Sequence, residues 1–333
     1  MKKSQNGFSL LTILAVLVVV GLITATGWYV YRSNQVATET FDELADVSTA
    51  QPASATRIAA AGDIACDPTD KHFSGADTNY CQMERTHALL TALNPETVLA
   101  LGDLQYENGA ADKFLASYDK SWGKIKSKTY PAPGNHEYNT SGAAGYYGYF
   151  GDRAGGSSKG YYSFDVGNWH LVSLNSNCDE VGGCNSGSPQ YQWLQQDLKD
   201  NPKACTLAYW HHPRFTSGRY SADQPSADRT GGFWQALRDR QADVALAGHD
   251  HLYERFAPQN PDGQADPDGI RHFTVGTGGK ILYKKGSLKS NSEVLIDNQF
   301  GVLVLDLYSK AYRWQFISID NKVLDSGYQQ CVV

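Results

Sequence analysis

One pattern recurs along most of the chain and restricts the folds that it can adopt. A short apolar run is followed by a small or turn-forming residue and then by Asp, Asn or His. The five instances are Ile58–Ala61 before Gly62-Asp63, Val98–Leu101 before Gly102-Asp103, Tyr130–Pro133 before Gly134-Asn135-His136, Leu207–Trp210 before His211, and Val244–Ala247 before Gly248-His249-Asp250-His251. Four runs are typical of buried β-strands, whereas the proline-bearing run is expected to be irregular.

Helix-like stretches separate these runs. They are Gln82–Leu93, Ala111–Ile125, Gln190–Lys199 and Gly232–Arg240. The alternation of strands and helices predicts an α/β domain. In such domains ligands bind beyond the carboxyl ends of the strands, where the Asp, Asn and His residues of the pattern lie.

The polar residues at these strand ends indicate metal binding only as a set. A single Gly-Asp after an apolar run is commonly a turn, and a lone His is more often structural. Together the five strand ends supply carboxylates, an amide oxygen and imidazoles. That set suits two adjacent divalent or trivalent ions about 3.5–4 Å apart.

The order of the motifs resembles that of the calcineurin-like metallophosphoesterases, and most closely the purple acid phosphatases. The resemblance covers about residues 57–333 and rests on Gly62-Asp63, Gly102-Asp103-Leu104-Gln105-Tyr106, Gly134-Asn135-His136-Glu137, His211-His212-Pro213 and Gly248-His249-Asp250-His251. Most metallophosphoesterases have Asp-x-His at the first motif, whereas this chain has Ala65 there and gains Tyr106 in the second motif. This is the purple acid phosphatase pattern, and it implies an αββα sandwich of two mixed β-sheets flanked by helices.

The resemblance also implies which residues hold the ions. The first ion would be held by Asp63, Asp103, Tyr106 and His251, and the second by Asp103, Asn135, His211 and His249. Asp103 would bridge the two. Because a phenolate is a hard anionic donor, we expect Fe(III) at the first position and Zn, Mn or Fe(II) at the second. No site for another cofactor is expected.

The expected reaction follows from two cations that share a water molecule. They lower its pKa and clamp the phosphate oxygens, so metal-bound hydroxide attacks directly and no covalent phosphoenzyme is required. His136 adjoins Asn135 and is the candidate general acid for the leaving alkoxide, a structural imidazole being the alternative. His212 is left without a catalytic role, because it could equally contact phosphate or stabilise the turn before Pro213. The remaining histidines are expected to be surface or core residues: His72, His87, His170 and His272.

The N-terminal segment predicts a membrane anchor. No residue from Phe8 to Tyr31 is charged, and a helix rising about 1.5 Å per residue would cross a hydrocarbon core of about 30 Å. A cleaved secretory signal is the alternative, but its apolar region is normally about 7–15 residues long. Lys2 and Lys3 precede the span and few basic residues follow it, so the catalytic part is expected outside the cytoplasm.

The start of the chain also resembles a type IV prepilin signal, which is cut after a glycine such as Gly7. Thr12 stands where prepilins usually carry a glutamate. Residues 33–56 are rich in Ala, Thr, Ser and acids and indicate a flexible tether. We therefore expect a transmembrane anchor at 1–32, a linker at 33–56 and a catalytic domain at 57–333, displayed at the cell membrane or released after processing.

The six cysteines form no C-x-x-C pair, so disulfides are favoured over a metal cluster. Export into an oxidising compartment supports this interpretation. The favoured pairs, from proximity and loop placement, are Cys66 with Cys81, Cys178 with Cys184, and Cys205 with Cys331. Scattered buried thiols are the alternative.

The whole pattern predicts an exported hydrolase that acts on phosphomonoesters as an acid phosphatase does. A phosphodiesterase acting on cyclic nucleotides, nucleic acid or phospholipid head groups is the alternative, because the same metal pair can attack diesters. A non-catalytic surface-display or pilus-associated module is a further alternative, against which the complete ligand set weighs. The formal charge of −6 is weak evidence against nonspecific nucleic-acid binding, so nucleic acid is expected only as a substrate. Oligomeric state is left open.

Overall fold

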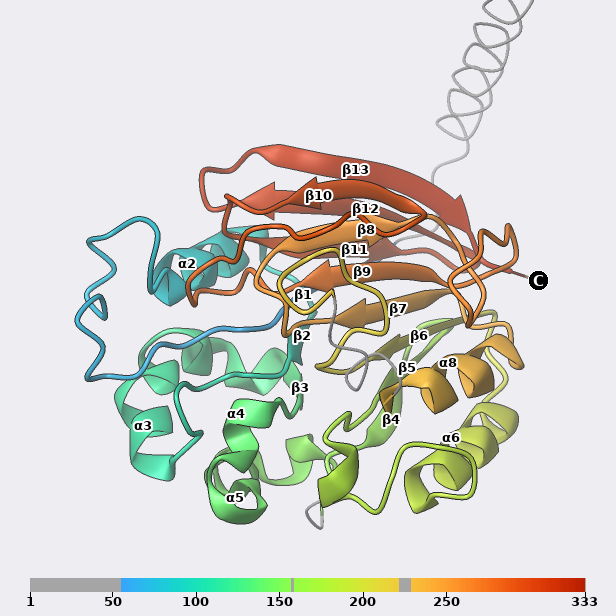
Figure 1. Ribbon diagram of the computed structural model, residues 1–333, viewed down its shortest axis with the longest axis horizontal. Helices are drawn as coiled ribbons and strands as arrows, with labels where there is room; N and C mark the ends of the chain where they lie inside the picture. Colours follow the sequence, from blue (N-terminus) through green and yellow to red (C-terminus); the bar gives the residue numbers. More distant parts are fainter. Residues whose placement is uncertain (1–54, 157–158, 222–228, 333) are drawn as a thin grey trace, which may run out of the picture. The chain divides into compact units, whose positions relative to one another are not determined.

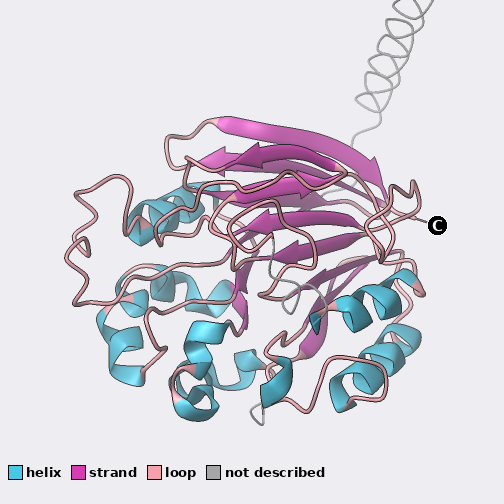
Figure 2. Cartoon of the chain, viewed as in Figure 1, coloured by secondary structure: helices cyan, strands magenta, loops and turns pink. Residues whose placement is uncertain are grey.

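Two mixed β-sheets pack against each other in this protein, with helices around them (Figures 1 and 2). The computed structural model describes residues 55–156, 159–221 and 229–332, which belong to one compact unit, Ser54–Val333. The expectation of two mixed sheets with flanking helices is confirmed.

The strand order is β13-β12-β11-β1-β2-β3 in the first sheet and β10-β8-β9-β7-β6-β5-β4 in the second. The bounds are β1 Thr56–Ala61, β2 Thr97–Leu101, β3 Thr129–Ala132, β4 Tyr162–Val166, β5 Trp169–Ser173, β6 Cys205–Tyr209, β7 Val244–Ala247, β8 Tyr253–Phe256, β9 Arg271–Val275, β10 Ser292–Ile296, β11 Gly301–Leu307, β12 Ala311–Ser318 and β13 Val323–Gln330. Strands β1, β2 and β3 are parallel, as are β5, β6, β7 and β9. The loops that follow these parallel strands carry the predicted ligands.

The apolar strand runs are buried on both faces, because each face packs against a different layer. In β6, Leu207 and Tyr209 belong to the core that the two sheets share, whereas Ala208 belongs to a second core. That second core also contains Leu194 and Trp234, which lie on the helices outside the second sheet. A strand that is buried on both faces is expected to have apolar residues at successive positions, as this run does.

The helices connect the strands (Figure 1). Their bounds are α2 Met83–Leu93, α3 Ala111–Ala116, α4 Asn135–Tyr138, α5 Ala144–Phe150, α6 Pro189–Asp200 and α8 Gly231–Arg238. Three of the four predicted helices are confirmed to within two residues, as α2, α6 and α8. Helix α6 begins where Ser188 accepts the N–H of Tyr191 (3.3 Å), with Pro189 in the first turn.

The fourth predicted helix, Ala111–Ile125, is wrong in its length. Helix α3 ends at Ala116, and two 3₁₀ segments follow, Tyr118–Lys120 and Trp122–Lys128. The Ser117 hydroxyl donates to the Cys66 carbonyl (2.7 Å), and the Tyr118 N–H donates to Gln105 Oε1 (3.0 Å). The first bond fixes Ser117 to another loop, and the second takes the Tyr118 N–H that a continuous helix would direct to a carbonyl four residues earlier.

The proline-bearing run Tyr130–Pro133, expected to be irregular, forms the regular strand β3 as far as Ala132. Strand β3 is the last strand of its sheet and pairs with β2 alone. Pro131 lacks an N–H, and an edge strand has one side on which that donor is not needed.

The three favoured disulfides are all present, with Cα–Cα separations of 5.6 Å for Cys66 with Cys81, 5.2 Å for Cys178 with Cys184, and 5.6 Å for Cys205 with Cys331. The predicted membrane anchor and nearly all of the tether lie outside the described residues. Within the described ranges, no helix is long and apolar enough to cross a membrane.

His170 on β5 is a buried histidine held between two carboxylates. Its Nδ1 lies 2.9 Å from Asp165 Oδ1, and its Nε2 lies 2.9 Å from Asp197 Oδ2. Burial by itself lowers the pKa of His170, but the hydrogen bonds with Asp197 and Asp165 outweigh burial and raise this pKa above its ordinary value. The imidazolium therefore stabilises the fold fully below about pH 6.5, and this contribution is lost as the pH rises through the raised pKa.

We expect His170→Asn to lower the melting temperature at roughly pH 5.5 by more than at roughly pH 9, because only the protonated ring benefits from both carboxylates. A domain of this size shifts by roughly 2–4 °C for each kcal/mol. Thermal unfolding followed by circular dichroism at both pH values measures the difference. His87→Asn is the control, since the pKa of His87 is lowered by burial. An equal shift for His170→Asn at both pH values would contradict the charged role.

Candidate metal centre

The carboxyl ends of the parallel strands of both sheets carry the predicted ligands. Asp63 follows β1, Asp103 follows β2, and Asn135 opens α4 after β3. From the second sheet, His211 follows β6, and His249 and His251 follow β7. The structure brings these six residues and Tyr106 together in one buried cluster, in which each lies within hydrogen-bond distance of another member.

The backbone at these strand ends is strained so that the side chains can converge. Asp63, Asp103 and His249 all have positive φ, at 61°, 50° and 68°. Two glycines allow the close approach. A Cβ at Gly102 (φ +83°) would lie 2.5 Å from His211 Nδ1, and a Cβ at Gly134 would lie 2.2 Å from Asp103 Oδ1.

One half of the cluster contains Asp63, Tyr106 and His251. The Tyr106 hydroxyl donates to Asp63 Oδ1 (2.8 Å) and lies 3.0 Å from His251 Nε2, which is itself 3.1 Å from Asp63 Oδ1. The Tyr106 hydroxyl oxygen, Asp63 Oδ1 and His251 Nε2 thus form a triangle of atoms that could bind one ion. It corresponds to the expected ligands of the first ion, without Asp103.

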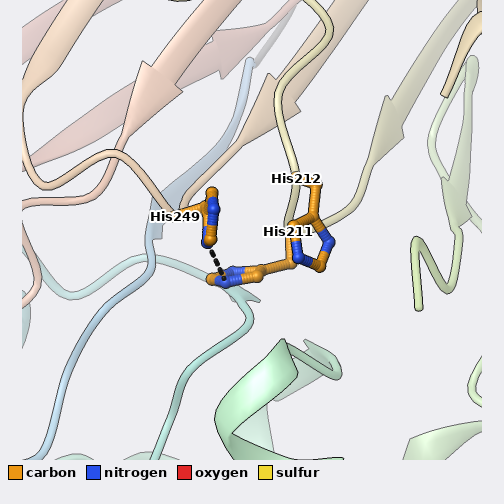
Figure 3. Close-up of side chains that lie close together, drawn as sticks. All are labelled: His211, His212 and His249. Carbon is orange, nitrogen blue, oxygen red and sulfur yellow. Dashed lines mark hydrogen bonds between the residues drawn. The ribbon is translucent and has the colours of Figure 1, made fainter. Parts of the chain in front are cut away.

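The other half contains Asn135, His211 and His249. His211 Nε2 lies 3.1 Å from Asn135 Oδ1 and 3.2 Å from His249 Nδ1. Figure 3 shows the rings of His211 and His249 approaching each other at these nitrogens. These are the expected ligands of the second ion, again without Asp103.

Asp103 joins the two halves. Its Oδ2 lies 3.1 Å from the Tyr106 hydroxyl and 3.2 Å from His211 Nε2, and its Oδ1 accepts the N–H of His136 (2.8 Å). The carboxylate is 2% exposed. This is the position that a bridging ligand requires.

The hydrogen bonds behind the imidazoles show that the residues fit metal ions. His211 Nδ1 lies 2.9 Å from the Leu101 carbonyl, and His251 Nδ1 lies 2.5 Å from the Ile281 carbonyl. Because a carbonyl only accepts, each Nδ1 carries a proton, and Nε2 is the ring atom that each imidazole can offer to an ion beside the carboxylates. These hydrogen bonds would hold the two imidazoles in the orientation that metal ligands require.

The electrostatics of the cluster without an ion point the same way. Burial, and then the charges of Asp103 and Asp63, raise the pKa of Tyr106 well above its ordinary value. Burial lowers the pKa of His211, but the Asp103 charge outweighs burial and raises this pKa to about 9. Burial and the neighbouring His211 lower the pKa of His249 to about 3. A bound cation would favour the phenolate and the neutral imidazoles that act as ligands.

His136, the candidate general acid, lies beside this cluster rather than within it. Its ring centroid is 4.3 Å from that of Tyr106, and its Nδ1 lies 2.7 Å from the Glu107 carbonyl. Its Nε2 lies 3.9 Å from Asp103 Oδ2, and its side chain is 24% exposed. The ring is therefore anchored on one side and accessible to solvent.

His212 is fully enclosed. Its Nδ1 lies 2.8 Å from the Ser176 hydroxyl, which also accepts the His212 N–H (3.0 Å). Burial, followed by the neighbouring His249 and His211, lowers the pKa of His212 well below its ordinary value. Figure 3 shows it next to His211, and its ring centroid is 4.5 Å from that of His249. This neutral ring supports the two candidate ligands.

Glu137 is a site residue that the sequence analysis did not single out. Its Oε1 accepts the N–H groups of Leu104 (2.9 Å) and Gln105 (3.1 Å), and its Oε2 accepts the N–H of Gly134 (2.8 Å). One buried carboxylate thus fastens the loop that follows β2 to the loop that follows β3. A glutamate three residues after Gly134, at the start of a helix, is the capping-box signal that could have revealed it.

Two tyrosines that the sequence analysis also missed cover the outer histidines. The Tyr220 ring stacks on His249 with centroids 4.1 Å apart, and the Tyr283 ring stacks on His251 at 3.9 Å. Asp250 holds the loop of Tyr220 in place, because it accepts bonds from the Thr216 hydroxyl (2.7 Å) and the Arg219 N–H (2.9 Å). No local sequence signal predicts these stacks.

Lys280 places a positive charge next to Tyr106. Its Nζ lies 5.0 Å from the centroid of the Tyr106 ring and pairs with Glu107 Oε1 (2.5 Å) and Asp70 Oδ2 (3.3 Å). Lys280 thus fastens the loop of Glu107 beside the Tyr106 ring.

Comparison with known proteins agrees with this geometry. The sequence pattern of the family described as calcineurin-like phosphoesterase matches residues 56–253, which is more than half of the 333 residues. The matched range contains all seven candidate ligands.

Individual relatives are purple acid phosphatases. Purple acid phosphatase 21 of Arabidopsis thaliana is 37% identical over 122 residues, which cover 36% of this chain and 26% of that protein. Purple acid phosphatase 23 of the same plant is 28% identical over 222 residues, which cover 56% of this chain and 47% of that protein. The chain therefore spans less than half the length of these two relatives.

A purple acid phosphatase from yellow lupin (Lupinus luteus) seeds shares the fold. Its structure matches with a TM-score of 0.64 and 19% identity, over 84% of this chain and 54% of that chain. At this identity the likeness concerns the fold alone.

Proposed function

The chain belongs to the calcineurin-like phosphoesterase family, and we propose that it hydrolyses phosphomonoesters at a two-metal centre, as an acid phosphatase does. One observation carries the proposal: seven metal-donating side chains converge from both sheets, and Asp103 touches both halves of the cluster. A non-catalytic display module would need no such complete set.

The proposed chemistry divides between the ions and the chain. Ions held by the seven ligands would supply the Lewis acidity that activates water and neutralises phosphate charge. Asp103 and the residues around it would hold these ions in place. His136, anchored through Nδ1 at the Glu107 carbonyl, would give the proton at Nε2 to the leaving alkoxide. Tyr220 and Tyr283 keep the two outer imidazoles in position and limit their contact with water.

We propose Fe(III) at the first position and Zn, Mn or Fe(II) at the second. Tyr106 supports a trivalent ion, because a phenolate is a hard anionic ligand.

We also propose that the N-terminal segment anchors the protein in the cell membrane and that the phosphatase faces outward. The uncharged stretch from Phe8 to Tyr31 and the preceding Lys2 and Lys3 support this location. The three disulfides agree with folding in an oxidising compartment.

A substrate panel tests the proposed function. The purified, metal-loaded protein should hydrolyse aryl, alkyl and nucleotide monoesters with kcat/KM values at least about tenfold above those for the matched diesters, and Asp103→Ala should abolish both activities. Asp112→Ala on the exposed side of α3 is the matched control. A preference of about tenfold for diesters would replace the monoesterase by a phosphodiesterase, and no turnover with two ions bound would favour a non-catalytic module.

Visible absorption tests the metal assignment. A tyrosinate bound to Fe(III) gives a charge-transfer band, so the purified protein should be coloured and Tyr106→Phe should lose the band. Metal analysis of the same samples should find close to two ions in the unaltered protein. Tyr149→Phe, which removes a hydroxyl bonded to Asp119, should keep the colour. A colourless, fully active protein would rule out the assignment.

The general-acid role of His136 makes a prediction that depends on the leaving group. His136→Ala should keep both ions but lower kcat for alkyl phosphates by about 10²–10⁴-fold, because a poor leaving group needs the proton. An activated aryl ester should be affected much less. Steady-state kinetics with both substrate types decides, and an equal loss for both would argue for a structural imidazole.

A further inference from the structure

A pocket of about 230 Å³ adjoins the candidate metal centre. It is shared by α4 and by the loop that follows β5, and the residues that matter here are Asn135, Asn139, Asn177, Asp179, Glu180 and Arg229. Asn135 belongs both to the pocket and to the candidate ligands of the second ion. A phosphate ester bound at that ion therefore has this pocket next to it.

The wall formed by the loop after β5 is rigidly built. Asn177 is 5% exposed, and its side-chain amide donates to the Pro133 carbonyl (3.1 Å) and to Asn175 Oδ1 (3.0 Å). Asn175 is held in turn by Gln190, which accepts its N–H (2.7 Å) and donates to its carbonyl (2.9 Å). The disulfide between Cys178 and Cys184 closes the segment that carries Asp179 and Glu180. These contacts position the pocket's polar groups before any substrate binds.

The polar atoms of the pocket are mainly acceptors. Because the Asn177 amide group donates to two acceptors in the protein, its Oδ1 is the atom left for a ligand. The Asn139 amide group donates to the Glu107 carbonyl (3.0 Å), and its Oδ1 is likewise left. Asp179 and Glu180 add two exposed carboxylates. Such a wall binds groups that carry several hydrogen-bond donors.

Arg229 restricts further which donor-bearing ligand groups the pocket can bind. Between described residues, Arg229 forms no ion pair with Asp179 or Glu180, so these charges do not neutralise one another in direct contact. A guanidinium in the pocket opposes an ammonium group, which the carboxylates alone would attract. An aryl or long alkyl group would find one aromatic ring, that of Tyr138, and no aliphatic side chain. Neutral hydroxyl groups satisfy every one of these neighbours.

We propose that this pocket binds the alcohol part of the substrate and selects phosphate esters of hydroxyl-rich alcohols, such as sugars and other polyols. This inference rests on the proposed phosphoesterase activity at the adjoining centre. Helix α4 carries both Asn135, which lines the pocket, and His136, the candidate proton donor. Recognition of the leaving group and its protonation then share one short helix.

Removal of the two carboxylates tests the proposal. In Asp179→Ala/Glu180→Ala, kcat/KM for glucose 6-phosphate should fall about tenfold, mainly through KM, whereas kcat/KM for butyl phosphate should change less than about twofold. Both positions are exposed, so the fold should tolerate the change. Glu84→Ala/Asp112→Ala, which removes two exposed acids from α2 and α3, is the matched control.

A second variant addresses Arg229 separately. Arg229→Gln should raise kcat/KM for phosphoethanolamine relative to glucose 6-phosphate, because the charge that opposes ammonium is gone. An unchanged ratio in this variant, or an equal loss for glucose 6-phosphate and butyl phosphate in the double variant, would overturn the proposal while leaving the phosphatase intact.

A binding experiment tests the pocket separately if the protein has no phosphoesterase activity. If the unaltered protein hydrolyses no phosphate ester, calorimetric titration with glucose 6-phosphate and with butyl phosphate still measures how tightly each ester binds. The proposal then requires tighter binding of glucose 6-phosphate in the unaltered protein and loss of that advantage in the double variant. Equal affinities in both proteins would refute it.

Discussion

The Asp103 carboxylate is the contact on which the candidate centre depends. It is buried, and its Oδ2 lies about as close to the Tyr106 hydroxyl (3.1 Å) as to His211 Nε2 (3.2 Å). A buried carboxylate is costly unless hydrogen-bond donors and positive charge lie beside it. The strained backbone at Asp103 and the missing Cβ of Gly134 are explained by the need to place this one group between the two halves.

The centre also holds the two sheets together. His211 comes from the second sheet, and its Nδ1 bonds to the Leu101 carbonyl at the end of β2 in the first sheet. Asp63, from the first sheet, accepts the N–H of His249 from the second (2.8 Å). Metal binding at such a position would stabilise the native arrangement of the layers as well as the reactive groups. Glu137 and Asp250 stabilise the loops around the centre, because each carboxylate accepts backbone N–H groups from a neighbouring loop.

Several features were predictable because they depend on local sequence. The buried strands β1, β2, β6 and β7 follow from uninterrupted apolar runs, and helices α2, α6 and α8 follow from their length and position between them. The helix predicted at Ala111–Ile125 failed because a side chain from a distant loop, Gln105, accepts the N–H of Tyr118 that would otherwise continue the helix. The strand with Pro131 was underestimated because only the sheet order shows that β3 lies at an edge.

The sequence by itself determined the chemistry available to this protein: carboxylates, an amide, a phenol and imidazoles placed after strand-forming runs, with glycines beside them. It also favoured the disulfide pairs that the structure has, since two of them close short loops and the third takes the remaining cysteines. Only the tertiary structure decided how these groups meet. The ring nitrogen that His211 and His251 turn inward depends on a distant carbonyl, that of Leu101 for His211 and that of Ile281 for His251. The pocket beside Asn135 likewise unites segments more than 90 residues apart, because folding brings α4 and Arg229 to the same side of the centre.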